Sequence, residues 1–413
     1  MLKIYFKQAI EMLKQDTFTG IIAIVGTALA IMMIMSIIVV DEVRNISVAP
    51  ESNRSHTYYI RYQIVKDSMW RNSGFIEYGI YHDYLSALST PEYVALVAMN
   101  TLPVGKEGED ETVNAKVKAT DASFWKIMSF SFIEGKPYGR EEFESGVAQA
   151  VVSDKLAKAV FKGQEVLGQT LMINYVPYRV TGIVKDISPV FRSASGDVWI
   201  PATSQEGFDE YAVLMLLRNR SDFRELEQEI RNVEKKYGIN NTGKELTLRG
   251  PDAHREDAVS AYYITKEEKD AALTAQYRKQ LLIFLILLLV PAVNLSGLSF
   301  SRIKKRTAET GVRKAFGARK HNILMQALFE NLITSLTGGI IGLVLSYLAV
   351  FQLKTWLLKI PADSSLPGEA FISFPVFAAV FIACVLINLL SAGMPAWRAS
   401  GLSIVDSLNE NDN

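Results

Sequence analysis

Long apolar runs alternate with charged segments along this chain. Four runs contain no charged residue, and each reaches the roughly 20 residues that a helix needs to cross a bilayer. They occupy residues 17–40, 281–301, 331–353 and 371–397. The pattern predicts a membrane protein with four transmembrane helices and a large extracytoplasmic domain inserted between the first and second.

Lysine and arginine near the ends of these runs set the expected orientation. Three lysines precede the first run, eight Lys or Arg residues lie within 302–321, and only Lys354 and Lys359 lie between the third and fourth runs. Because basic loops stay on the cytoplasmic side, both termini and the 302–321 loop are predicted to be cytoplasmic. The expected order begins with a cytoplasmic amphipathic helix (1–16), the first span (17–40), an extracytoplasmic core domain with its stalk (41–279) and the second span (280–301). A cytoplasmic coupling loop (302–322) and the third span with an interfacial lead-in (323–353) follow. The chain then continues with a short external loop (354–370), the fourth span (371–397) and a cytoplasmic tail (398–413).

The segment 41–279 mixes strand and helix patterns, which predicts an α+β domain. Runs rich in Val, Ile and Tyr predict strands at 57–65, 147–152, 169–175, 178–187, 197–201 and 211–217. Helices are expected at 153–161 and 221–238, the second with Ser221 as N-cap and Gly238 as its stop. Leu226, Ile230, Val233 and Tyr237 would form its buried face.

Two charged segments border this domain. Residues 41–47 are expected to extend the first span before Pro50 ends the helix. Strong helix formers at 265–280 predict a helix that continues into the second span. Together these helices would form a stalk.

Composition and motifs narrow the function. Lys+Arg and Asp+Glu both number 44, so net charge says nothing about an acidic partner. No nucleic-acid partner is expected. The single cysteine, Cys384, excludes a disulfide framework and a cysteine-based metal site. None of the four histidines has metal-ligand spacing, and neither a G-x-x-x-x-G-K-[ST] nor a G-x-S-x-G motif occurs. We expect neither an enzyme nor a resident cofactor or metal.

The basic stretch RIKKRTAETGVRKAFGARKH (302–321) has two interpretations. Its charge would suit a cytoplasmic anchor on anionic lipid. However, residues 309–316 also fit a short helix that ends at Gly317, with Val312, Ala315 and Phe316 on one apolar face. An anchor requires no such structured face, so the pattern favours docking into a groove of a cytoplasmic partner.

Residues 306–343 resemble the signature of MacB/FtsX-like ABC transporter permeases, in which R-E-[IT]-G-[IV]-R-K-A-x-G-A precedes a Q-x-L-x-E helix. The segments FIEGKPY (132–138) and VVSDKLAKAVFKGQEVLGQTLMINYVPYRVTGIVKD (151–186) resemble the periplasmic core domain of that family, and 393–410 resembles its closing segment. Lys305, Ala308 and Ser403 depart from the usual pattern, which leaves open which ATPase the loop accepts.

The resemblance implies a dimer of permease subunits, homomeric or heteromeric, each bound to a cytoplasmic ABC ATPase. Since no ATPase domain is present in the chain, that ATPase would be a separate subunit that binds ATP. The coupling residues would be Arg306, Glu309, Gly311, Val312, Arg313, Lys314, Phe316, Gly317 and Arg319. Val312 and Phe316 would fill a groove on the ATPase. ATP-driven closure would then move the stalk and the external domain by mechanotransmission.

The resemblance places the protein in the bacterial cytoplasmic (inner) membrane and leaves three functions open. One is export of a drug, peptide or envelope substrate, with a periplasmic adaptor and an outer-membrane channel as partners. The alternatives are a non-transporting signal transmitter that regulates cell-wall hydrolases, and a lipoprotein-releasing permease. The large external domain favours export or lipoprotein release. Gly338, Gly339 and Gly342 are further expected to permit close helix packing.

Overall fold

The computed structural model of the chain describes residues 11, 17–204, 207–208, 210–254, 266–305, 315–316 and 320–358, together with 378–379, 381–383, 385–386, 389–390, 393 and 397. These residues fall into two compact units. The helical unit draws on Met1–Val43, Tyr277–Lys359 and Gly368–Asn413, and the α+β domain on Arg44–Gln276 and Ile360–Pro367.

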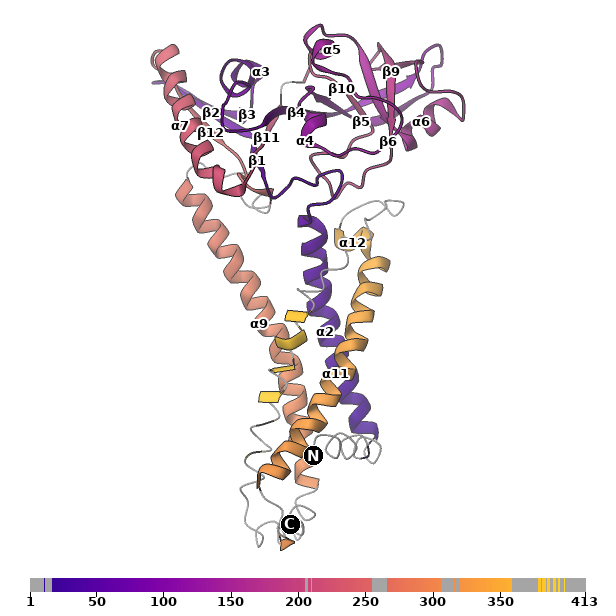
Figure 1. Cartoon of the computed structure of the whole chain (residues 1–413), viewed down its shortest axis with the longest axis vertical. Helices are drawn as coiled ribbons and strands as arrows, with labels where there is room; N and C mark the ends of the chain where they lie inside the picture. Colours follow the sequence, from indigo (N-terminus) through magenta and orange to yellow (C-terminus); the bar gives the residue numbers. More distant parts are fainter. Residues whose placement is uncertain are drawn as a thin grey trace. The chain divides into compact units, whose positions relative to one another are not determined.

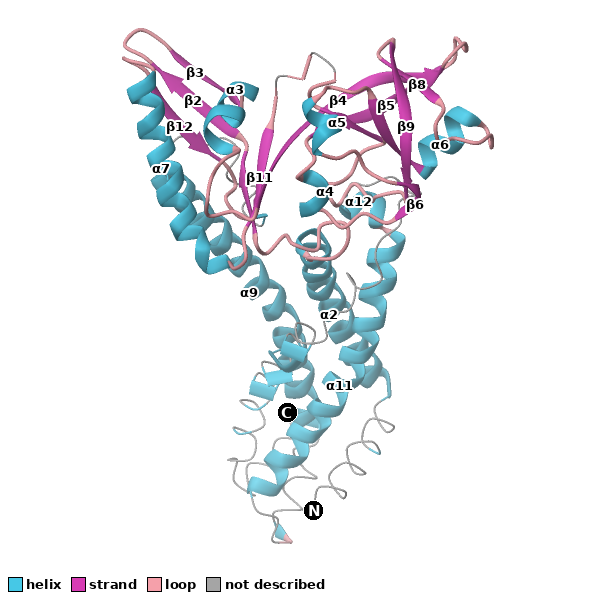
Figure 2. Ribbon diagram, turned by 45° about the horizontal axis from the view of Figure 1, so that its top comes forward, coloured by secondary structure: helices cyan, strands magenta, loops and turns pink. Residues whose placement is uncertain are grey.

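A nine-stranded mixed sheet is the centre of the α+β domain (Figure 2). Its main path runs β1-β11-β4-β5-β10-β7-β9-β6, and β8 pairs with β4 and β9. The strands are β1 (Thr57–Ile60), β4 (Tyr93–Lys106), β5 (Thr112–Thr120), β6 (Phe132–Gly135), β7 (Gln149–Ser153), β8 (Thr170–Ile173), β9 (Val176–Val184), β10 (Val198–Pro201) and β11 (Ala212–Leu216). Most neighbours are antiparallel, whereas β5–β10 and β7–β9 are parallel.

The parallel pair β7–β9 is connected through α6 (Asp154–Phe161) and the β8 strand. The Ser153 side chain caps this helix by accepting a hydrogen bond from the Leu156 amide at 3.2 Å. The helix ends at Lys162 in the left-handed conformation, followed by Gly163. Short helices complete this part: α3 (Tyr78–Ile80), the π-helix η1 (Tyr81–Leu85), α4 (Phe124–Ile127) and α5 (Arg140–Glu144).

A second, three-stranded sheet has the order β12-β2-β3. It contains β12 (Glu245–Arg249), β2 (Tyr62–Lys66) and β3 (Arg71–Phe75), and α7 (Phe223–Asn240) packs on it (Figures 1 and 2). Leu226, Ile230 and Val233 of α7 are buried as predicted, and Tyr237, the fourth residue of the predicted face, is partly buried against the core. We refer to this sheet and α7 together as the α7 lobe.

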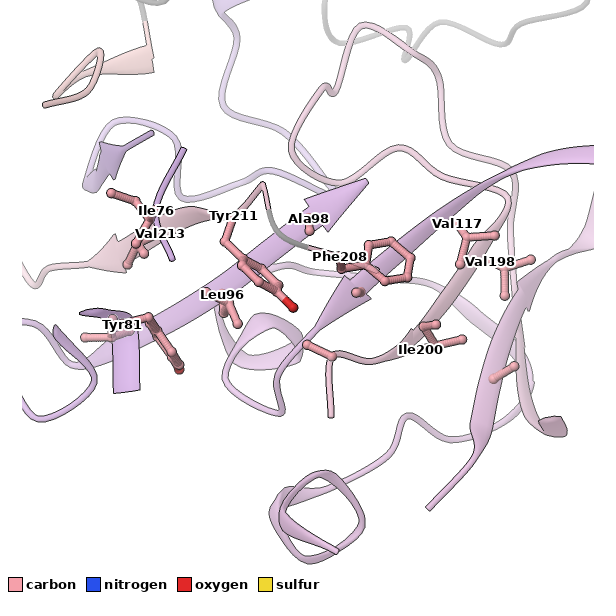
Figure 3. Packing of buried hydrophobic residues seen from close by; sticks show 14 of the residues in the cluster. Ile76, Tyr81, Leu96, Ala98, Val117, Val198, Ile200, Phe208, Tyr211 and Val213 are labelled. Atoms are coloured by element: carbon pink, nitrogen blue, oxygen red, sulfur yellow. The ribbon is translucent and has the colours of Figure 1, made fainter. Parts of the chain in front are cut away.

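The main hydrophobic core lies between the strands of both sheets and helices α6 and α7. Figure 3 shows part of it, where Leu96 of β4 lies near Val213 of β11 and Val117 of β5 lies near Val198 and Ile200 of β10. A second cluster, which includes Phe124 and Trp199, contains residues of α4, β7 and β10. Both clusters lie within the α+β domain, so this domain has a core of its own.

Three local predictions in this domain are wrong. Residues 57–65 form two strands, because β1 pairs with β11 whereas β2 pairs with β12 and β3. The helix predicted at 221–238 begins after a 3₁₀ turn, η2 (Arg220–Asp222), so Ser221 is not its N-cap. Gly238 does not end it either, since the helix continues to Asn240.

The longest helices are α2 (Thr17–Asn45), α9 (Lys266–Lys305) and α11 (Lys320–Gln352), followed by the short α12 (Lys354–Leu358). Among the described residues, Thr17–Val43 and Lys320–Gln352 have the length and hydropathy of membrane spans. Most of the predicted fourth span lies outside the described residues, so the prediction of four spans stays a prediction. The α2 helix ends at Asn45, before Pro50 as expected.

Small residues bring α11 close to α2, as predicted from Gly338 and Gly342. A Cβ atom on Gly342 would lie 2.6 Å from the carbonyl oxygen of Ala28, and one on Gly338 would lie 2.9 Å from that of Ile24. Real Cβ atoms do not approach oxygen so closely, so only glycine permits this packing. Gly339 similarly faces the ring of Phe381.

Candidate functional site: two attachments of the α+β domain

Phe316 is the one predicted coupling residue that the structure describes, and its side chain is 88% exposed. The other predicted coupling residues lie outside the described residues: Arg306, Glu309, Gly311, Val312, Arg313, Lys314, Gly317 and Arg319. Their roles stay predictions. The structure instead describes two polar attachments at the ends of the domain, one after α2 and one at the start of α9.

The first attachment is a buried ion pair in the segment that follows α2. Arg54 Nε lies 2.6 Å from Glu51 Oε2, and both side chains are at most 2% exposed. The Arg54 guanidinium also donates to the carbonyl oxygens of Ile46 at 2.9 Å and Val190 at 3.0 Å, and it lies over the Phe191 ring. Arg54 thereby ties the residue that follows α2 to a distant loop.

We call this loop, residues 190–194, the anchor loop. Glu51 accepts a hydrogen bond from the Ala194 amide at 2.8 Å. From β5, Lys118 Nζ donates to the carbonyl oxygens of Arg192 at 2.9 Å and Ser193 at 2.5 Å. Burial lowers the pKa of Lys118 to about 7, and the nearby Glu51 carboxylate opposes this shift. The anchor loop is therefore fixed to the sheet and to the segment after α2.

The second attachment lies at the first turns of α9. Lys269 Nζ forms an ion pair with the Asp252 carboxylate, and Lys269 is 9% exposed. Asp252 is itself fixed by two backbone hydrogen bonds with Tyr59 of β1, at 3.1 and 3.2 Å. The ion pair thus joins the start of α9 to the edge of the main sheet through the short segment at Asp252.

Two backbone features make this connection possible. A Cβ atom on Gly250 would lie 1.9 Å from the Tyr59 carbonyl oxygen, so only glycine allows the chain to pass β1 so closely. Asp252 has a φ of 55°, in the left-handed region that Asp tolerates better than most residues. Together they place the Asp252 carboxylate next to Lys269.

Arg249 lies beside the same junction. Its Nε and Nη1 atoms are buried and form no hydrogen bond within the described part of the chain. Burial is the main reason that its pKa is lowered, and Arg71 adds to the shift while Glu268 of α9 opposes it. The start of α9 therefore contacts the domain through charges of both signs.

A third buried polar group, Asp121, lies where β5 meets α4. Its carboxylate accepts hydrogen bonds from the Tyr81 hydroxyl at 2.5 Å and from the Phe124 amide at 3.0 Å. Burial raises its pKa to about 7, against the effect of these hydrogen bonds. It joins η1 to α4 inside the domain.

The described residues contain no cluster of three or more His, Cys, Asp or Glu side chains that could hold a metal ion. His82 pairs with Asp83 at 2.8 Å, but both side chains are well exposed. This pair is a surface contact.

An α+β domain between helices of membrane-span length defines a membrane-anchored protein with a large extramembranous domain. Residues 20–233 match the family described as MacB-like periplasmic core domain, and residues 281–404 match the FtsX-like permease C-terminal family. The chain belongs to the MacB/FtsX-like family of ABC transporter permeases.

Curated relatives agree with this assignment. Over 308 residues the chain is 26% identical to the macrolide export ATP-binding/permease protein MacB of Shewanella sp. (strain W3-18-1), a match that covers 72% of this chain and 44% of that protein. Over 307 residues it is 22% identical to the uncharacterized ABC transporter permease YknZ of Bacillus subtilis (strain 168), covering 72% and 71% of the two chains. The chain thus matches less than half the length of this MacB relative.

Two solved structures are similar to part of this chain. The periplasmic region of MacB from Actinobacillus actinomycetemcomitans gives a TM-score of 0.35 at 13% identity, covering 47% of this chain and 88% of that one. The extracellular domain of the YknZ transporter from Gram-positive bacteria gives a TM-score of 0.37 at 14% identity, covering 47% and 100%.

Sequence reasoning missed both attachments. Glu51 and Arg54 are three residues apart in a segment with no periodic pattern, and their partners in the anchor loop are about 140 residues away. Asp252 and Lys269 are likewise ordinary charges in the sequence. The one relevant sequence signal was the helix predicted at 265–280. A helix that continues from the domain into the second apolar run implies a rigid connection, which the domain has to contact at its start.

Proposed function

We propose that this chain is the permease subunit of an ABC transporter and transmits the movement of a separate cytoplasmic ATPase to its extracytoplasmic domain. The observation that supports this most strongly is α9, a single helix of 40 residues from Lys266 to Lys305 (Figure 1). Its first turns are ion-paired to the domain through Asp252. Its last residue directly precedes the predicted coupling residues.

In this proposal α9 carries the stroke and the segment after α2 is the fixed attachment. A helix transmits axial displacement because its backbone hydrogen bonds resist stretching. The Lys269–Asp252 pair would pull on β1 through Tyr59, while the Glu51–Arg54 pair would hold the anchor loop. Movement of α9 relative to α2 would then distort or rotate the domain.

We further propose export of a drug, a peptide or an envelope substrate as the activity. Family membership supports a partner ATPase that binds the ATP, a second permease subunit, and location in the bacterial inner membrane with both termini cytoplasmic. A periplasmic adaptor and an outer-membrane channel would complete the export path. One relative is named as a macrolide export protein, and that name is the reason we propose export as the direction of transport.

Co-purification tests the ATPase contact. The chain is expressed with the ABC ATPase encoded nearest its gene, and Phe316→Asp is expected to abolish recovery of the ATPase. Tyr175→Asp is a matched control, because Tyr175 is similarly exposed, at 83%, but lies in the α+β domain. Undiminished recovery with Phe316→Asp would refute docking through this residue.

A further inference from the structure

Three exposed apolar side chains lie at the end of the α7 lobe that contains the β2–β3 turn and the last turn of α7. Met69 and Trp70 occupy the β2–β3 turn and are 90% and 46% exposed, and Ile239 in the last turn of α7 is 78% exposed. The chain that leaves α7 enters β12 at Glu245, which pairs with Lys66 at the end of β2. The turn and the end of α7 therefore lie at the same end of the lobe (Figure 2). We call these three residues the apolar tip.

Part of the turn's backbone is paired within the turn. Asp67 Oδ1 accepts hydrogen bonds from the amides of Met69 at 2.7 Å and Trp70 at 2.8 Å. The Asp67 amide donates to the Trp70 carbonyl oxygen at 3.0 Å. These bonds reduce the number of backbone groups that would lose water when the tip contacts a bilayer.

Basic side chains surround the tip. Five exposed ones come from the ends of the adjoining elements: Lys66, Arg71, Lys235, Lys236 and Lys244. Two acids lie among them: Asp67, which accepts the turn amides, and Glu245, which lies 4.0 Å from Lys66. Lys244 Nζ lies 5.9 Å from the centre of the Trp70 ring, so charge and apolar surface are directly adjacent.

We propose that the apolar tip is a lipid-binding site that inserts Met69, Trp70 and Ile239 into the interface of an anionic bilayer. The basic ring would contact lipid phosphates while the apolar side chains enter the acyl boundary. Tryptophan favours this interfacial depth, and lysine and arginine can extend their charged ends to the head groups. Met69 and Trp70 lie in the β2–β3 turn, and Ile239 lies in the last turn of α7 at the same end of the lobe.

Vesicle co-flotation tests this proposal on the full chain. The protein is placed in nanodiscs of neutral phosphatidylcholine and mixed with vesicles of phosphatidylcholine alone or with added phosphatidylglycerol. We expect flotation with the anionic vesicles only, weakened by salt. Met69→Ser combined with Trp70→Ser should lower binding at least about tenfold, and Lys244→Gln about fivefold.

Controls test whether vesicle binding depends on the apolar tip itself. Tyr175→Ser removes an aromatic side chain from the β8–β9 turn that is more exposed than Trp70, 83% against 46%, and should leave flotation unchanged. Empty nanodiscs should not float. Absence of flotation by the wild-type chain, or equal loss with Tyr175→Ser, would overturn the proposal. A photo-crosslinker at residue 70 that captures a protein in cells, and no lipid, would likewise assign the tip to a protein partner.

Discussion

Glu51 and Lys118 hold the same loop through opposite backbone groups. Glu51 accepts a hydrogen bond from the amide of Ala194, whereas Lys118 donates to the carbonyl oxygens of Arg192 and Ser193. The two side chains come from the segment after α2 and from β5, so one loop connects the chain leaving α2 with the middle of the sheet. The stability of this junction is open to direct test.

Breaking the buried pair should destabilise the domain strongly. Arg54→Met leaves the Glu51 carboxylate without its cation in an environment about 2% exposed, so we expect a loss of about 3–5 kcal/mol. Denaturant unfolding followed by tryptophan fluorescence measures this loss. Arg140→Met breaks an exposed pair with Glu144 and should change stability very little. Equal effects of the two substitutions would contradict a structural role for the buried pair.

Lys118 should make the domain more stable at alkaline pH. Its pKa is about 7 in the folded chain against 10.5 for a free lysine, so between these values the unfolded state binds more protons. Stability should therefore rise from about pH 7 towards pH 10, with a slope of up to about 1.4 kcal/mol per pH unit. Lys118→Met should remove this rise, and an unchanged slope in that variant would assign it to other groups.

Asp121 should make the domain less stable as the pH rises from about 4 to about 7, the opposite of the effect of Lys118. Its pKa is raised from 3.8 to about 7 by burial, so in this interval the folded state holds a proton that the unfolded state has lost. Stability should fall as pH rises from about 4 to about 7. Asp121→Asn should flatten the curve there while keeping a side-chain acceptor for the Phe124 amide. A fall of the same size in Asp121→Asn would show that Asp121 is not its source.

Loss of the Lys269–Asp252 pair should loosen the start of α9. Lys269→Met removes a charged hydrogen bond, an effect of about 1.5–3 kcal/mol. Amides near Lys269 should then exchange with solvent about tenfold faster or more, as followed by hydrogen exchange and mass spectrometry. The neighbouring exposed Glu267→Gln is the matched control and should exchange as the wild type does. If the ion pair is also the force-bearing contact, Lys269→Met should stop transport while the ATPase still co-purifies.

A side chain at Gly342 should separate α11 from α2. Gly342→Leu places atoms where the Ala28 carbonyl oxygen lies, so we expect overpacking that lowers stability by about 1–3 kcal/mol. Thermal unfolding in detergent reports the change. Ile341→Leu alters the adjacent exposed position and should leave the melting temperature unchanged. A melting temperature unaffected by Gly342→Leu would contradict the close packing.

Periodic elements of this fold were predictable from sequence. The buried face of α7, the extension of α2 to Asn45 and the continuation of 265–280 into the next apolar run all follow from repeating local patterns. The hairpin of β4 and β5 was not predicted, although β4 is the longest strand. Pro103 and Gly105 interrupt its apolar pattern, and β5 alternates Lys and Asn with small residues.

Long-range polar contacts were not predictable in the same way. Nothing near Lys118 in the sequence indicates that its ammonium group would be buried against two carbonyl oxygens. Such a group is stable only because a loop some 75 residues away supplies acceptors, and that pairing depends on the finished tertiary structure. The coupling residues predicted from sequence lie instead within one short motif, and their roles stay predictions.

The length of α9 has a consequence for how this protein would respond to mutation. Between Lys266 and Val290 the helix contains neither glycine nor proline, so about 37 Å of it lacks a residue that favours bending. If α9 transmits the movement of the ATPase as proposed, a glycine pair introduced near Thr274 would supply such a residue. The ATPase could then bind and hydrolyse ATP without moving the extracytoplasmic domain.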